Sequence, residues 1–93
     1  MKGSERGAKR PKIPHRLVMV EWEDSAQPVS DWQWVETYEV PETVLCVSVG
    51  YLIADTTDAL ALAPNIGDVG RERIQASGII RIPRCAVQRI ADL

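Results

Sequence analysis

The sequence predicts a mainly β protein that folds as one small antiparallel barrel. Three observations lead to this fold class: the chain is short, at 93 residues, several segments alternate apolar and polar residues, and glycines stand inside two of those segments. Alternation with a period of two is typical of half-buried strands, and an internal glycine marks the sharp bends that small barrels use. We therefore expect a five-stranded barrel of SH3-like or Sm-like type over residues 17–93, preceded by a flexible basic arm over residues 1–16.

The first strand is expected over Leu17–Glu23 (LVMVEWE), where Val18, Val20 and Trp22 share one face. This face should belong to the core, because the chain contains no Phe and its Trp and aliphatic residues must supply the apolar volume.

A loop and a short helix are expected next. Asp24–Gln33 carries the Asp, Ser and Pro residues that favour turns. Trp34–Val40 should form one or two helical turns, with Ser30 or Asp31 as the N-cap. Pro41 ends the helix, because it lacks the backbone N–H that a helix interior needs.

The strongest strand pattern covers Thr43–Ala54 (TVLCVSVGYLIA), with Gly50 predicting a bend or bulge in its middle. A polar turn at Asp55–Asp58 leads to Ala59–Ala63, which is too short before Pro64 for a helix and is expected to be a strand. Alternation places five large residues on one face of the long strand: Leu45, Val47, Val49, Tyr51 and Ile53. The other face carries Leu52 and four smaller residues: Cys46, Ser48, Gly50 and Ala54.

Two further strands complete the expected barrel. Pro64–Gly70 reads as a loop because it is rich in Pro, Gly and Asn. Arg71–Ile82 alternates and should be one strand, bent at Gly78. Cys85–Ile90 is expected as a short last strand that turns Cys85 and Val87 inward, with Ile90 and Leu93 closing the end.

The charges are segregated along the chain. Residues 1–16 hold six Lys or Arg and one Glu, a net charge of +5, whereas residues 17–93 hold five Arg and twelve acids, a net charge of −7. No Lys or Arg stands between Leu17 and Gly70. The basic arm could contact nucleic acid or serve only as a soluble tail, and the acidic body would repel a polyanion.

Several function classes are disfavoured. Cys46 and Cys85 are expected to be buried free thiols, and the lone His15 gives no metal-ligand spacing, so we expect no metal, no cofactor and no enzyme activity. No apolar run approaches the 18 residues of a membrane span, and no signal-peptide core follows the basic arm, so a cytoplasmic protein is expected.

Binding is the remaining class, and six residues are its candidates. Trp32 and Trp34 flank a loop and could stack an aromatic base, or they could cover an open barrel end. Arginine is suited to planar recognition of phosphate or carboxylate, although these side chains could equally neutralise acidic neighbours. The candidate arginines are Arg71, Arg73 and Arg81, which alternation places on one face of the expected strand, and Arg84, which follows Pro83.

Four segments together carry a family resemblance. They are VEWED at Val20–Asp24, a Trp after a short loop (Trp32 or Trp34), CVSVGYL at Cys46–Leu52 and IPRCAVQRIADL at Ile82–Leu93. The pattern resembles a group of small uncharacterised phage-encoded proteins. The resemblance implies a viral protein that works in the cytoplasm of the host cell, and it brings no established activity and no catalytic residues; an anti-defence role belongs to the first hypothesis below.

Three hypotheses follow. The first is a non-enzymatic homo-oligomer that sequesters a nucleotide-derived signalling molecule, with the six candidates at its subunit interface. The second is an Sm-like module that binds single-stranded nucleic acid, helped by the basic arm. The third is an inhibitor that binds a host protein through an acidic surface supplied by seven residues: Glu21, Glu23, Asp24, Asp31, Glu36, Glu39 and Glu42.

Overall fold

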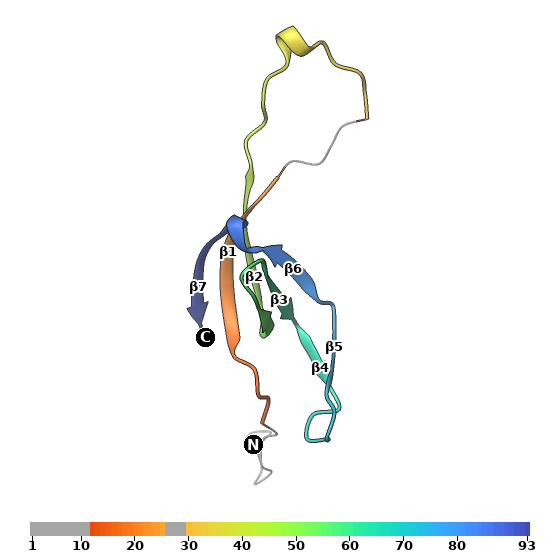
Figure 1. The fold of residues 1–93 in the computed structure, drawn as a ribbon, viewed down its shortest axis with the longest axis vertical. Helices are drawn as coiled ribbons and strands as arrows, with labels where there is room; N and C mark the ends of the chain where they lie inside the picture. The colour runs from red at the N-terminus through yellow and green to blue at the C-terminus, as the bar shows by residue number, and fades with distance from the viewer. Residues whose placement is uncertain (1–11, 26–29) are drawn as a thin grey trace, which may run out of the picture.

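The computed structural model describes residues 12–25 and 30–93 and is mainly β (Figure 1). Five strands form an antiparallel sheet in the order β6-β3-β2-β1-β7, and β4 and β5 form a separate two-stranded ribbon. The strands of the large sheet are β1 (Leu17–Asp24), β2 (Val44–Asp55), β3 (Ala59–Ala63), β6 (Ile80–Pro83) and β7 (Val87–Asp92). The ribbon consists of β4 (Asn65–Gly67) and β5 (Gln75–Ser77).

The expected closed barrel is not found. Consecutive strands β6 and β7 stand at opposite edges of the five-stranded sheet, and no pairing joins them within the described residues. The 3-10 turn η2 (Arg84–Ala86) connects them, and its first residue donates a backbone hydrogen bond of 2.9 Å to the carbonyl of Asp58. The sheet is therefore not closed by strand pairing, although this short turn brings its two edge strands together at one end.

The prediction of a single strand over Arg71–Ile82 is wrong. Residues 71–74 lie in the turn between β4 and β5, and Gly78 separates β5 from β6. Gly78 has a φ of 74°, in the left-handed region that favours glycine, so the bend expected at this position is confirmed. Strand β4 was not predicted: it lies inside the expected Pro64–Gly70 loop and pairs with β5.

The helix expected over Trp34–Val40 is reduced to the 3-10 turn η1 (Val35–Thr37). Trp34 is its N-cap, without a side-chain cap bond, so the expected capping by Ser30 or Asp31 is wrong. A short helix is marginal unless tertiary contacts bury one of its faces. No residue of η1 is buried, so that support is lacking.

Gly50 serves close packing rather than a bend. The register of the β2–β3 pair shifts between Leu52 and Ala54, beyond the glycine. The inner face of β2 is the one with small residues, and Gly50 lies there beneath the end of β3.

The core is small and aliphatic. Six buried side chains from four strands form it: Val18, Val20, Leu52, Leu60, Leu62 and Ile82. The inward orientation of Val18 and Val20 is confirmed, and Trp22 packs against this cluster while its indole Nε1 donates a 3.0 Å hydrogen bond to the Ser48 hydroxyl.

Large apolar residues of β2 face solvent. Leu45, Val47 and Val49 are all more than half exposed, and Leu17 of β1 lies on the same face opposite Tyr51. The expected burial of both thiols is wrong, since Cys46 is half-buried and Cys85 exposed in η2, where a 3-10 turn replaces the start of the expected strand.

The last residues of the expected basic arm contact the sheet. The Arg16 carbonyl accepts a 2.8 Å hydrogen bond from the Leu52 N–H, and the Arg16 guanidinium lies 2.7 Å from the Asp92 carboxylate. The His15 Nδ1 lies 3.1 Å from the Leu52 carbonyl, which can only accept, so this nitrogen carries the proton. Residues 1–11 of the arm lie outside the described residues.

Candidate binding surfaces at two ends of the molecule

The segment 30–43 extends away from the sheet at one end of the long axis (Figure 1). The molecule measures 66 × 30 × 24 Å, and its radius of gyration of 18.8 Å exceeds the roughly 12 Å expected of a compact domain of this length. We call this segment the projecting loop. It leaves the body where the β1–β2 pairing ends, at Asp24 and Val44, and Thr43 closes its base with a 2.9 Å hydrogen bond to Glu23.

The projecting loop displays its aromatic side chains. Trp32 is 102% exposed and Trp34 is 80% exposed, and with Gln33 they line a hollow of about 280 Å³. Val35, Tyr38 and Val40 are also exposed. Neither Trp32 nor Trp34 covers an end of the sheet, which leaves the indole faces open to stacking.

The projecting loop is also acidic. Its charged residues are all acids, and each is exposed: Asp31, Glu36, Glu39 and Glu42. Among the described residues none of these four carboxylates enters an ion pair. The loop therefore presents apolar and negative groups together.

Arg71 and Arg73 stand at the other end of the molecule, in the turn between β4 and β5 (Figure 1). Asp68 organises this turn: its carbonyl accepts a 3.0 Å bond from the Arg71 N–H, and its carboxylate accepts a 2.6 Å bond from Gln75. Both arginines are exposed, and within the described part of the chain neither pairs with a carboxylate.

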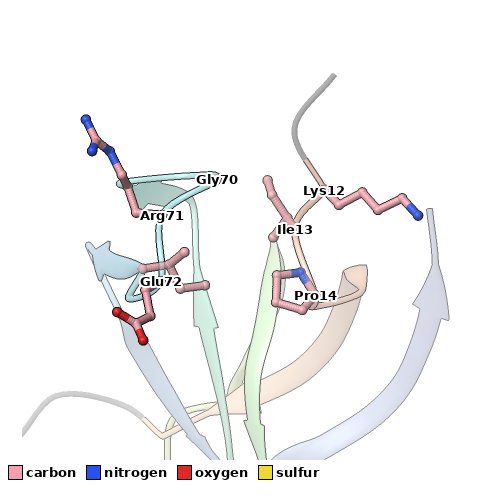
Figure 2. Close-up of a pocket in the computed structure, with 7 residues that line it drawn as sticks. Lys12, Ile13, Pro14, Gly70, Arg71 and Glu72 are labelled. Atoms are coloured by element: carbon pink, nitrogen blue, oxygen red, sulfur yellow. The ribbon is translucent and has the colours of Figure 1, made fainter. Parts of the chain in front are cut away.

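A large hollow opens beside this turn. It has a volume of about 530 Å³ and lies between residues 12–14 and residues 70–74. Ile13, Pro14 and Ile74 supply its apolar walls. Figure 2 shows the Lys12 and Arg71 side chains extending away from the gap on opposite sides, so their charged ends point outward from its rim and not into the hollow. Glu72 adds one carboxylate to the same rim.

Arg81 and Arg84 are placed differently. Arg81 is exposed on β6 opposite Ala61, away from the turn that carries Arg71. Arg84 in η2 pairs with the Asp55 carboxylate at 2.9 Å, which partly satisfies its guanidinium. The expectation that Arg71, Arg73 and Arg81 share one strand face is wrong, because the strand breaks at Gly78.

Within one chain, the two halves of the candidate site therefore do not meet. The tryptophans lie in the projecting loop, and Arg71 and Arg73 lie at the opposite end of the long axis (Figure 1). Sequence analysis missed the apolar walls of the large hollow, because these residues come from segments more than fifty positions apart. The Ile-Pro pair that follows Lys12 in the basic arm was the one available signal.

The described residues form no cluster of metal ligands. No group of three or more His, Cys, Asp or Glu that could hold a metal ion occurs among residues 12–25 and 30–93. His15 uses its Nδ1 on a backbone carbonyl. No helix in the described part of the chain is long and apolar enough to cross a membrane.

Comparison with known proteins finds no protein family, no curated protein and no solved structure that matches this chain.

Proposed function

We propose that this chain is a non-enzymatic binding protein that works as a homo-oligomer and holds a nucleotide-derived small molecule where its copies meet. The observation that carries the proposal is the separation of exposed Trp32 and Trp34 from exposed Arg71 and Arg73. A nucleotide combines an aromatic base with phosphates, so its site needs a stacking surface beside guanidinium groups. Contact between copies can bring the two together.

Each candidate residue has a distinct role in this proposal. Trp32 or Trp34 stacks on the base. Arg73 is exposed in the β4–β5 turn and holds phosphate oxygens. Arg81 contributes less because it lies on β6 away from that turn, and Arg84 contributes less because Asp55 already holds its guanidinium. Arg71 stands at the rim of the large hollow and positions the contact.

The origin of the protein is part of the same proposal. The resemblance noted in the sequence implies a phage-encoded protein. Capture of a host signalling nucleotide would give such a protein an anti-defence role. Such a protein would work in the cytoplasm of the infected cell.

The acidic projecting loop supports a second candidate function. Four exposed carboxylates without an ion pair in the described structure, beside exposed apolar groups, would suit a basic surface on a host protein. In that function the loop alone makes the contact, and the arginines are not needed.

Tryptophan fluorescence tests the proposal. The purified protein is titrated with cyclic dinucleotides, ADP-ribose derivatives and a short U-rich RNA. We expect a saturable response to one nucleotide that Arg73→Ala weakens about tenfold and that Arg89→Ala, which removes an arginine paired with Glu21, leaves intact.

Other responses overturn the proposal. A response to RNA alone that fades with salt favours nucleic-acid binding. No response to any nucleotide, together with capture of a basic protein that Glu36→Gln abolishes, favours the inhibitor function.

A further inference from the structure

The geometry points to a head-to-tail contact in which the projecting loop of one copy docks on the large hollow of the next copy. This inference rests on the proposed homo-oligomer and names the two surfaces that form it. The loop supplies Trp32 and Trp34, and the hollow supplies Ile13, Pro14 and Ile74. The occupant is a second copy of this chain.

Shape and polarity favour this pairing. The hollow has about 530 Å³ and apolar walls, which suits an indole, and sites for small molecules span about 300–1,000 Å³. The loop carries two indoles that touch nothing large in their own chain, since they are 102% and 80% exposed. Aromatic side chains gain most from burial at such contacts.

Charge complementarity sets the direction of the contact. The loop carries four acids and no cation over residues 30–43. Lys12 and Arg71 line the hollow with their charged ends pointing outward from its rim, and Arg73 follows in the same turn as Arg71. These three cations outnumber the two carboxylates there, those of Asp68 and Glu72. A contact between the projecting loops of two copies would bring negative charges together, which is unfavourable. The loop of one copy therefore meets the hollow of another.

The position of the two surfaces excludes a contact within one chain. The loop and the β4–β5 turn stand at opposite ends of a molecule that is 66 Å long (Figure 1). A head-to-tail contact repeats from copy to copy and gives a ring if the rotation closes, or a filament if it does not. It also brings Trp32 and Trp34 close to Arg73, which the proposed nucleotide site requires.

Charge reversal on the full chain tests the contact. One variant carries Glu36→Lys and Glu39→Lys in the loop, a second carries Lys12→Glu and Arg71→Glu at the rim, and a third carries all four substitutions. Mass is measured by light scattering over a concentration series, and circular dichroism checks folding. We expect each double variant to raise the dissociation constant of the assembly about tenfold or more.

The fourfold variant is the matched control, because it restores opposite charges in the reversed sense. We expect it to assemble as the unsubstituted chain does, which also shows that the substituted residues leave the fold intact. Mixing the two double variants should likewise restore assembly.

The outcomes separate this inference from the proposed function. An unsubstituted chain that is monomeric at every concentration overturns both. An assembly that survives in both double variants overturns only the head-to-tail contact and leaves the homo-oligomer standing. If Val47→Ser with Val49→Ser then dissociates that assembly, the outer face of β2 is the interface.

Discussion

Gly50 and Ala63 lie so close together that a Cβ at position 50 would press against backbone atoms of Ala63. A Cβ built on Gly50 would stand 3.1 Å from the Ala63 carbonyl oxygen and 3.2 Å from the Ala63 backbone nitrogen. These are backbone atoms at the end of β3, so they cannot rotate away. The contact lets the end of β3 pass over the inner face of β2 and close the core around Leu52 and Leu62.

Gly50→Ala should therefore destabilise the fold, by about 1–3 kcal/mol, because it overpacks a backbone contact. Gly67→Ala is the matched control, since its Cβ would meet the Gln75 side chain at 3.3 Å, and that side chain can move. Urea unfolding measures both. Equal stability of the two variants would contradict the close contact at Gly50.

Leu62→Ala should cost about 2–5 kcal/mol, because it opens a cavity in a core of six side chains. Leu45→Ala makes the same chemical change at a site that is 66% exposed, and we expect it to cost less than about 1 kcal/mol. The comparison is made by urea unfolding at a concentration where the chain is monomeric. A large loss from Leu45→Ala would mean that the outer face of β2 is covered.

The three tryptophans should differ in their access to solvent. Trp22 packs against the core and hydrogen-bonds Ser48, whereas Trp32 and Trp34 are exposed in the projecting loop. In dilute protein, acrylamide should quench Trp32 and Trp34 strongly and Trp22 weakly, as single-Trp variants would show. If the head-to-tail contact forms, quenching of the loop tryptophans should fall as concentration rises.

The ion pair between Arg84 and Asp55 should contribute little to stability. Its atoms lie 2.9 Å apart, but both side chains are more than 40% exposed, and exposed pairs contribute about 0–1 kcal/mol. Arg84→Ala should thus lower the free energy of unfolding slightly, and less at high salt, where screening weakens the pair. Thermal melts at two salt concentrations measure the effect, and a loss that salt leaves unchanged would indicate a packing role instead.

Sequence analysis predicted one half of the candidate site better than the other. Trp32, Trp34 and Arg71 are candidates from the sequence alone, but whether the two tryptophans are exposed or cover an end of the barrel stayed open until the structure showed both exposed. The hollow between Ile13 and Ile74 could not be predicted, because it exists only where two distant segments come to lie side by side.

The sequence by itself determined where most strands lie, because a period of two survives in β1, β2 and β3 whatever surrounds them. It also determined the break at Gly78 and the separation of acidic and basic segments. The tertiary structure decided which face of β2 turns inward. Both of its faces are largely apolar, and the inner one is the face that carries Leu52 into the core and lets Ala63 approach Gly50. It also decided that the sheet stays open and that the tryptophans and arginines stand apart, since these depend on how distant segments pack and not on any local pattern.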